Sequence, residues 1–339
     1  MSVDPQALVG RSVTVAVPAT IANLGAGYDV LGLAIELHNE LRVGIDGVAA
    51  SGAGAIAYRC FGAGEGELPG DRRNLAVDAV YRGLIAAGVA GADRLSVTIE
   101  ATNRIPLARG LGSSAAAIVA GLCAGAALAH GAAPGPAVDA LSDELLDRLF
   151  AAADELEGHP DNVAAALFGG LVASGRHDGL LTARVVDVPD DAVPVVLVPD
   201  VRLDTAAMRA ALPKGVSLDD AVHNASRLAL GIAALHANDV RGFALLADDR
   251  LHQAARARRY PALPSLLDAA TNAGATSACL AGSGSSVLAI VDDATGGDEA
   301  IEAVIVALNE AAERAKVGGG AEQYEIDHDG ARVVAYSGA

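Results

Sequence analysis

The sequence predicts an α+β protein built from two domains. A chain of 339 residues is longer than a single hydrophobic core usually supports, so two domains in close contact are expected. Strand-like and helix-like patterns are mixed along the chain, without the regular alternation of a doubly wound sheet. Four segments rich in glycine and polar residues, at 18–29, 110–114, 155–162 and 282–286, interrupt the apolar elements. Each alone has an explanation as turn chemistry, but together they point to active-site loops.

The first part of the chain is predicted to be mostly strands. Residues 13–17 alternate as in a half-buried strand, and a turn-rich loop at 18–29 separates them from an extended apolar run at 31–37. Residues 74–87 carry apolar side chains at helical spacing, which predicts a helix. Further strands are expected at 42–45, 55–60 and 95–100.

Helices are expected in the middle of the chain. Residues 115–129 are apolar on every face, which is typical of a central buried helix. Residues 142–156 are amphipathic and begin with Ser142 and two acidic residues, a helix-start signal. After the polar break at 157–162, a short apolar helix is expected at 163–168, ended by two glycines, and then a strand from residue 171.

The last part of the chain is predicted to form the second domain. A seam near residues 175–179 gives domains 1–175 and 176–339, the first holding the glycine-rich turn at 110–114. Strands are expected at 193–198, 278–280, 287–291 and 332–336, and helices at 217–237, 242–256, 264–273 and 298–315.

Composition and charge restrict the classes of partner. Hydrophobic residues make up 52% and charged residues 19%, as in a compact folded protein. The net charge of −18 argues against binding to nucleic acid or to anionic membranes, which requires clustered Lys and Arg. Cys60, Cys123 and Cys279 are odd in number and far apart, which fits a reduced cytoplasm. No signal peptide is expected, and the most apolar helix is predicted to be too short for a membrane span.

The glycine-serine turn at 110–114 is the strongest candidate for chemistry. Gly110 and Gly112 permit backbone angles and a close ligand approach that side chains would prevent. Ser113 and Ser114 follow at the start of a helix, where free N–H groups and the helix dipole favour an anion. The alternative is an ordinary Ser N-cap before a buried helix. A Walker A loop is excluded because no lysine follows the last glycine.

These segments together resemble the GHMP kinases, named for galactokinase, homoserine kinase, mevalonate kinase and phosphomevalonate kinase. The run Pro106-x-x-x-Gly-Leu-Gly-Ser-Ser-Ala-Ala resembles their ATP-binding signature, and Gly282-Ser-Gly-Ser-Ser286 resembles their C-terminal glycine motif. The resemblance implies a ribosomal S5-like N-terminal domain and a ferredoxin-like C-terminal domain. It also implies that ATP and Mg²⁺ are used.

Within this family, the resemblance is strongest to the branch that phosphorylates homoserine, and it extends nearly from end to end. Residues 17–32 resemble the N-terminal substrate motif of that branch, and residues 155–162 with 168–170 resemble its metal and substrate segment. Thr205-x-x-x-Arg209 and Leu251-His-Gln-x-x-Arg256 also match. The implied reaction is ATP-dependent phosphorylation of the L-homoserine hydroxyl to O-phospho-L-homoserine, a step towards threonine.

The chemistry of a homoserine-like amino acid agrees with the roles that the resemblance implies. Asp29 is the candidate partner of the substrate ammonium, and Arg209 and Arg256 are candidates for its carboxylate. The alternative for both arginines is a solvated helix face. Asn23 is a candidate for orienting the nucleophilic hydroxyl. The resemblance implies that Thr205, with His159 or Asn162, completes this pocket.

The nucleotide and metal residues follow from the same resemblance. The triphosphate is expected along 110–114, with Asn74 a candidate contact of adenine. Ser114 and Glu155 are expected to hold Mg²⁺, with Glu157 as the fallback, because residues two apart on a helix do not share a face. Asn23, Ser114 and Glu155 form the expected catalytic set, whereas Asp161 is left out as an equally good N-cap. The expected nucleotide-binding residues are Asn74, Pro106, Arg109, Gly110, Leu111, Gly112, Ser113, Ser114 and Ala115.

Two departures from the family pattern affect the shape of the expected pocket. The substrate loop reads Gly25-Ala-Gly-Tyr-Asp29 where the family has Gly-Pro-Gly-Phe-Asp, and Ala254-Ala255 replaces Pro-Tyr. A GHMP kinase for another small alcohol or amino-alcohol, and a non-catalytic metabolite-binding relative, therefore remain as alternatives. A cytoplasmic homodimer is expected from the habit of the family.

Overall fold

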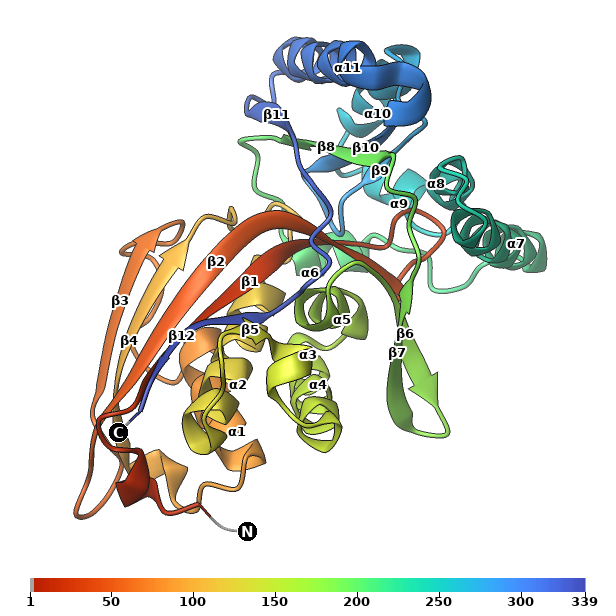
Figure 1. Ribbon diagram of the computed structural model, residues 1–339. Helices are drawn as coiled ribbons and strands as arrows, with labels where there is room; N and C mark the ends of the chain where they lie inside the picture. The colour runs from red at the N-terminus through yellow and green to blue at the C-terminus, as the bar shows by residue number, and fades with distance from the viewer. Residues whose placement is uncertain (1–2, 339) are drawn as a thin grey trace.

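The first domain is a long, mostly antiparallel sheet, with one parallel pair (β3 and β4), that wraps over a layer of helices. The structure is a computed structural model that describes residues 3–338. Six strands lie in the order β3-β4-β2-β1-β12-β5, and the β6–β7 hairpin extends the far end of β2 (Figure 1). The strands are β1 (Ser12–Ala22), β2 (Leu31–Val48), β3 (Ile56–Gly62), β4 (Leu95–Asn103), β5 (Gly135–Pro136), β6 (Leu171–His177), β7 (Leu180–Val186) and β12 (Arg332–Ser337).

The helical layer is centred on α2, which is covered on all sides. Gly121 and Gly125 let α1 pack very closely, since a Cβ at either position would lie within 2.5 Å of an α1 carbonyl oxygen. α2 is apolar and long enough to cross a bilayer, but 83% of it is buried inside the protein. The expected central buried helix is therefore confirmed, although it is longer than predicted. The helices are α1 (Leu75–Ala86), α2 (Ser113–His130), α3 (Ala137–Ala140), α4 (Asp143–Glu157) and α5 (Pro160–Phe168).

The second domain is a four-stranded antiparallel sheet, in the order β11-β8-β10-β9, that packs against two helices. Its separate core joins Leu197 and Val287 of the sheet to Leu266 of α10 and Val304 of α11. The strands are β8 (Ala192–Val198), β9 (Ser277–Leu280), β10 (Val287–Asp292) and β11 (Gly320–Gln323). The helices are α6 (Thr205–Ala210), α7 (Leu218–His236), α8 (Gly242–Ala247), α9 (Gln253–Ala257), α10 (Leu263–Asn272) and α11 (Asp293–Ala315). Two 3₁₀ turns, η1 (Pro5–Leu8) and η2 (Ala92–Arg94), belong to the first domain.

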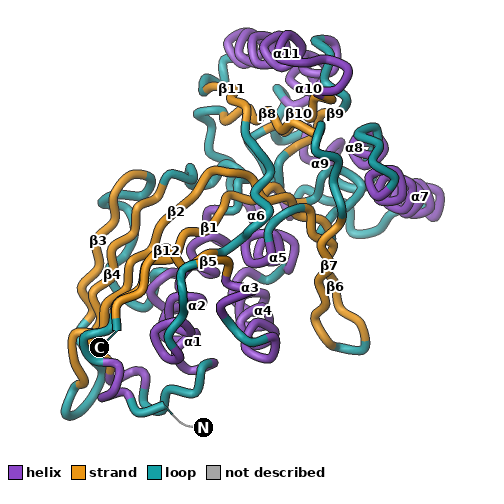
Figure 2. The backbone as a smooth tube through the Cα atoms, in the orientation of Figure 1, coloured by secondary structure: helices purple, strands orange, loops and turns teal. Residues whose placement is uncertain are grey.

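The α+β class is confirmed, but the predicted seam is not where the sheets separate. Residues 175–179 fall in the β6–β7 hairpin, which is still paired with β2 of the first sheet. The second sheet begins only with β8, and β12 then returns to pair with β1. The backbone tube shows this return as a loop that descends from the upper domain and ends in a strand of the lower sheet (Figure 2). The division into 1–175 and 176–339 therefore requires correction.

Other differences concern where elements end. The expected strands at 31–37 and 42–45 are one continuous β2, because the residues between them, Asn39 included, also pair with β1. The expected helix at 242–256 is two short helices, α8 and α9, with an acidic turn between them. The last helix begins earlier than predicted and is kinked at Gly297. α6, β7 and β11 were not predicted.

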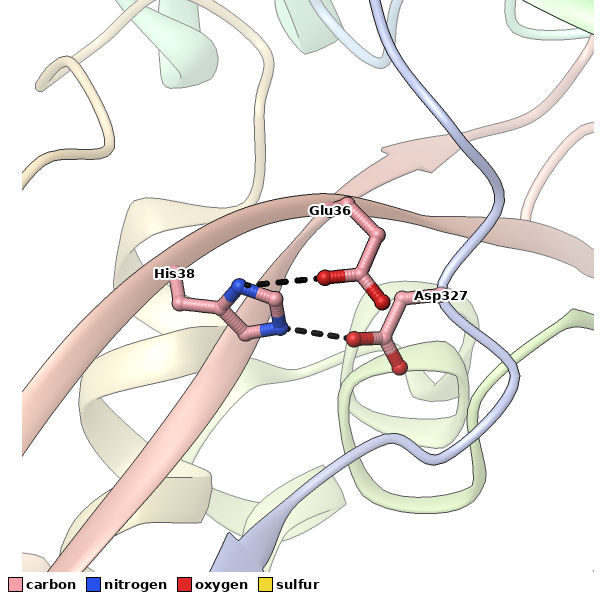
Figure 3. Close-up of side chains that lie close together, drawn as sticks. All are labelled: Glu36, His38 and Asp327. Atoms are coloured by element: carbon pink, nitrogen blue, oxygen red, sulfur yellow. Dashed lines mark hydrogen bonds and ion pairs between the residues drawn. The ribbon is translucent and has the colours of Figure 1, made fainter. Parts of the chain in front are cut away.

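A charged cluster fastens the returning C-terminal segment to β2. Glu36 and His38 lie two residues apart on one face of β2, and the buried Asp327 approaches them from the segment before β12 (Figure 3). His38 Nε2 lies 2.6 Å from Asp327 Oδ2. The other Asp327 oxygen accepts from the N–H groups of Asp329 and Gly330.

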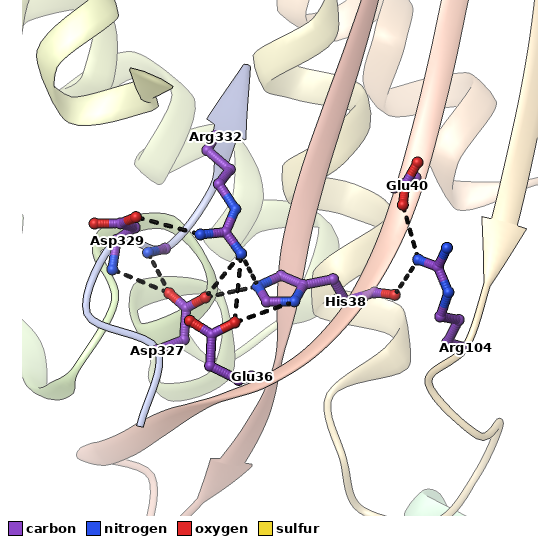
Figure 4. Close-up of polar contacts among 8 residues, drawn as sticks. Glu36, His38, Glu40, Arg104, Asp327, Asp329 and Arg332 are labelled. Atoms are coloured by element: carbon purple, nitrogen blue, oxygen red, sulfur yellow. Dashed lines mark hydrogen bonds and ion pairs between the residues drawn. The ribbon is translucent and has the colours of Figure 1, made fainter. Parts of the chain in front are cut away.

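Arg332 supplies the positive charge of this cluster. Its Nη2 lies 2.7 Å from His38 Nε2, 3.5 Å from Glu36 Oε2 and 3.6 Å from Asp327 Oδ2 (Figure 4). A guanidinium nitrogen thus lies close to all three groups that would otherwise resemble metal ligands. Burial raises the pKa of Asp327, but the hydrogen bonds from His38 and Gly330 outweigh it, so the pKa falls below its ordinary value. We interpret the cluster as an ion-pair network that holds the C-terminal return in place.

Replacing Asp327 by Ala is expected to lower the free energy of unfolding by about 3 kcal/mol, because it leaves buried N–H groups and charges without their acceptor. Urea denaturation measures the change. Asp329→Ala is the matched control, since its carboxylate is exposed and its ion pair with Arg332 is expected to contribute at most about 1 kcal/mol. Equal losses for the two variants would show that the network does not stabilise the fold.

Candidate active site

All four glycine-rich or polar segments line one cavity between the two domains. The cavity has a volume of about 120 Å³. Its wall combines the loop after β1, the turn before α2, the start of α5, and residues of α6, α9 and the loop after β9. The expectation that these segments form one site is therefore supported by their positions in the fold.

The turn before α2 is built by close backbone contacts. Gly110 has φ +79°, and a Cβ there would lie 2.2 Å from the carbonyl oxygen of Ala281. Gly112 has φ +66°, and its Cβ would lie 1.9 Å from Thr20 Oγ1. The N-cap of α2 is Gly112, with no side-chain cap, so the Ser N-cap alternative is wrong. The first N–H groups of α2 are therefore at the cavity wall, where an anion is favoured.

The metal candidates require a correction. Ser114 Oγ donates to Glu157 Oε2 at 2.6 Å, and both residues line the cavity. Glu155 does not line it: its side chain is 73% exposed and lies 3.5 Å from Arg82. Because α4 continues as a helix through Glu157, residues two apart point in different directions, and only Glu157 faces the site. Burial raises the pKa of Glu157, although the hydrogen bond from Ser114 opposes this.

Two of the expected nucleotide residues have structural partners. Arg109 lines the cavity, but its guanidinium donates to the carbonyl oxygens of Leu107, Pro199 and Asp200, which ties the turn to the second domain. Asn74 lies outside the main cavity and caps α1 by accepting from the N–H of Ala76.

Asn74 instead borders a smaller cavity beside α2. This second cavity, of about 30 Å³, is also lined by Tyr58, Asn103 and Ala117. Of the other expected nucleotide residues, Ala115 is buried in the core and lines neither cavity. The remaining ones line the main cavity and are Pro106, Gly110, Leu111, Gly112, Ser113 and Ser114.

The loop between β1 and β2 is held from within by Asn23. Its Nδ2 donates to the carbonyl oxygen of Gly282 at 3.0 Å, and its Oδ1 accepts from the N–H of Asp29 at 3.1 Å. Gly25 fits closely under α8, since a Cβ there would lie 2.3 Å from the carbonyl oxygen of Leu246. Asn23 therefore fixes the position of Asp29 and joins the loop to the second domain.

The two expected substrate arginines differ in their surroundings. Arg209, from α6, forms a bidentate ion pair with Asp29, at 2.9 and 3.0 Å. Arg256, from α9, is only 3% exposed. Both line the cavity, and the burial of Arg256 shows that it does not lie on a solvated helix face, whereas Arg209 remains partly exposed. Thr205, one turn before Arg209, shares a hydrogen bond with Ser283 at 3.1 Å.

Arg256 is held by a neutral histidine that the sequence analysis did not assign. Arg256 Nη1 donates to the carbonyl oxygen of Gly282 at 2.8 Å and lies 3.1 Å from His252 Nδ1. His252 Nε2 lies 2.9 Å from the carbonyl oxygen of Gly25, to which it donates. Burial lowers the pKa of His252 to about 4, so Nδ1 accepts from Arg256 at neutral pH. Asp249 caps this segment by accepting from the N–H groups of residues 251–253.

The start of α5 brings three polar residues to the cavity. His159 Nδ1 lies 2.8 Å from Asp161 Oδ1, and this hydrogen bond raises the pKa of His159. The N-cap of α5 is His159, so Asp161 is not the N-cap and its carboxylate faces the site. Asn162 Oδ1 accepts from Thr20 at 2.8 Å. The sequence predicts a loop at Thr20 and so gives no sign of this contact, whereas Thr20 lies in β1 beneath Gly112.

The glycine turn at the start of α2, set between two α+β domains, fits a phosphotransferase of the GHMP kinase class. Family models of the GHMP kinase N-terminal and C-terminal domains match residues 74–170 and 232–309. This confirms the expected class and two-domain fold.

Curated relatives identify the branch of the GHMP kinases to which the chain belongs. A homoserine kinase of Leifsonia xyli is 41% identical over 290 residues, covering 84% of this chain and 83% of the relative. One of Moorella thermoacetica is 40% identical over 275 residues, covering 81% and 86%. The crystal structure of homoserine kinase from Cytophaga hutchinsonii is 28% identical, with a TM-score of 0.81 over 95% of this chain and 97% of that one. The chain belongs to the homoserine kinase family.

The unfolding free energy is expected to fall as the pH is lowered from about 6.5 to 4, because the folded protein keeps His252 neutral while the unfolded chain takes up a proton. From the pKa of about 4, the loss attributable to this residue amounts to about 3 kcal/mol. Urea titrations at pH 4.5 and 7 measure it. His252→Gln keeps a donor and an acceptor without a titrating group, and should show a smaller difference between the two pH values. An identical pH dependence in the variant would contradict the assignment.

Proposed function

We propose that this chain transfers the γ-phosphoryl group of ATP to the hydroxyl of L-homoserine, giving O-phospho-L-homoserine and ADP. The observation that carries the proposal is the state of Arg256. Among residues 3–338, its nearly buried guanidinium bonds only to a carbonyl oxygen and an imidazole, and its Nε has no partner. A buried guanidinium without a carboxylate needs an anion, which the substrate carboxylate would supply.

The rest of the cavity is suited to the other groups of the amino acid. Asp29 is the carboxylate available to the substrate ammonium, and Arg209 lies beside it for the carboxylate. An acid such as mevalonate would make no use of Asp29. We assign Asn23 to the reacting hydroxyl, as a positioning group, and His159, Asn162 and Thr205 to the surrounding wall.

The nucleotide is assigned to the turn before α2. The triphosphate would lie along residues 110–114, where backbone N–H groups rather than lysines meet its charge. We place adenine at the small cavity lined by Tyr58 and Asn74, whose wall includes residues of α2. Arg109 acts mainly by anchoring the turn, since three of its N–H groups already bond to carbonyl oxygens.

Mg²⁺ is assigned to Ser114 and Glu157, because a hydroxyl next to a carboxylate at an anion site offers the hard oxygen ligands that this ion prefers. When bound, it would neutralise charge on the phosphates. The cavity residues then serve to hold the hydroxyl in line with the γ-phosphate, since phosphoryl transfer depends mainly on positioning and charge neutralisation. Asp161 is engaged with His159 and the N–H of Asn162, and we assign it to positioning rather than to base catalysis.

We further propose that the enzyme acts in the cytoplasm as a homodimer, on small molecules rather than on nucleic acid or membranes. The net charge of −18 supports this choice of partners. Light scattering at micromolar concentration tests the dimer, and a monomer would contradict it.

ADP release with ATP and Mg²⁺ is expected to be stimulated by L-homoserine far more than by L-threonine, L-serine, mevalonate or galactose. The ammonium and carboxylate pairs select an amino acid, and the cavity must also bring its hydroxyl to the phosphate. A coupled ADP assay measures this. If a folded preparation shows no homoserine-stimulated release, the proposed reaction is wrong.

Glu157→Gln is expected to lower kcat/KM at least about tenfold and to raise the Mg²⁺ concentration needed for half-maximal rate, because an amide is a poorer ligand than a carboxylate. Glu155→Gln is the matched control on the same helix, and it should leave both values unchanged. If the two variants behave in the opposite way, Glu155 rather than Glu157 is the metal ligand.

A further inference from the structure

The ion pair between Asp29 and Arg209 joins the two candidate subsites for the charges of the substrate. Both side chains line the main cavity, and the two contacts measure 2.9 and 3.0 Å. The residues lie 180 positions apart in the chain and come from different domains. Without a ligand, the Asp29 carboxylate and the Arg209 guanidinium, which we assign to the two charges of the substrate, therefore neutralise each other.

The pair is placed so that it can open. Asp29 is 32% and Arg209 is 44% exposed, so water screens their attraction and compensates each charge when they separate. Neither backbone depends on the pair. The Asp29 N–H is held by Asn23, and α6 is capped by Asp204 and anchored by the buried Met208.

Arg256, in contrast, is not free to move away from its partners. Arg256 is buried and bonded to His252 and to the carbonyl oxygen of Gly282. The two guanidinium carbons lie 5.9 Å (Arg209) and 5.4 Å (Arg256) from the centroid of the Tyr28 ring. The fixed guanidinium of Arg256 and the movable one of Arg209 thus both lie near the Tyr28 ring, next to Asp29.

We propose that substrate selection works by pair exchange: a zwitterionic amino acid replaces the Asp29–Arg209 pair with two intermolecular pairs, its ammonium with Asp29 and its carboxylate with Arg209. This inference rests on the proposed function and adds the means of selection. A ligand with a carboxylate alone can pair with Arg256, but to reach Arg209 it must break the internal pair and leave Asp29 without a partner. The internal ion pair therefore lowers the affinity of the site for monoanions, in addition to the contacts they fail to make.

The test compares L-homoserine with 4-hydroxybutyrate, which has the same hydroxyl and carboxylate but no ammonium. Calorimetric titration gives the Kd of each ligand for the wild-type chain, Asp29→Asn, Arg209→Gln and the double variant. In Asp29→Asn, L-homoserine is expected to bind at least about tenfold more weakly, whereas 4-hydroxybutyrate binds several-fold more tightly because Arg209 has been released. Glu67→Gln, which breaks the exposed Glu67–Arg202 pair, controls for the loss of one negative charge.

The double variant separates exchange from simple repulsion between Asp29 and an anion. If the gain for 4-hydroxybutyrate comes from releasing Arg209, adding Asp29→Asn to Arg209→Gln should produce no gain. A gain that persists in that background, or an unchanged affinity for 4-hydroxybutyrate in Asp29→Asn, would overturn the proposal. If wild-type protein binds no L-homoserine at all, the proposed function itself fails. Thermal melting of each variant establishes that it is folded before the titrations.

Discussion

The site depends on one contact between the domains, in which the loop after β9 docks on the turn before α2. The carbonyl oxygen of Gly282 accepts from both Asn23 and Arg256, while Gly110 lies against the backbone of Ala281. These bonds fix the substrate loop, the second arginine and the phosphate turn relative to one another. A displacement of this loop would therefore disturb every subsite together. Glycine is required at Gly110 because a Cβ there would lie 2.2 Å from the carbonyl oxygen of Ala281.

Burial distinguishes the charged groups that hold the site from those that are free to respond to a ligand. Arg256 is desolvated and kept in place by His252, which can accept its N–H only while it is neutral. Arg209 remains partly in water and finds its partner across the cleft. An arginine side chain is thus a fixed support at position 256, where it is buried, and an adjustable contact at position 209, where it is partly solvated.

Most of the site could be predicted because its residues lie in segments where apolar patterning lapses and glycine is frequent. Asp29, Ser114, Arg209 and Arg256 all reach the main cavity as expected. Periodicity did not resolve Glu155 from Glu157, since the choice depends on how α4 is rotated against its neighbours. It also missed Thr20 and His252, whose roles arise from contacts distant in sequence. The domain seam was misplaced because β12 returns to the first sheet through pairing that no local pattern reveals.

The position of β12 also bears on how the chain reaches its native state. This strand lies between β1 and β5, although in the chain it follows all the strands of the second domain. Until β12 has been synthesised, β1 has an unpaired edge where β12 will bind, and the Glu36–His38 side of β2 lacks Asp327. The first domain is therefore completed only after the second domain has been synthesised, by its most non-local pairing, so this edge is exposed to association with other chains until β12 binds.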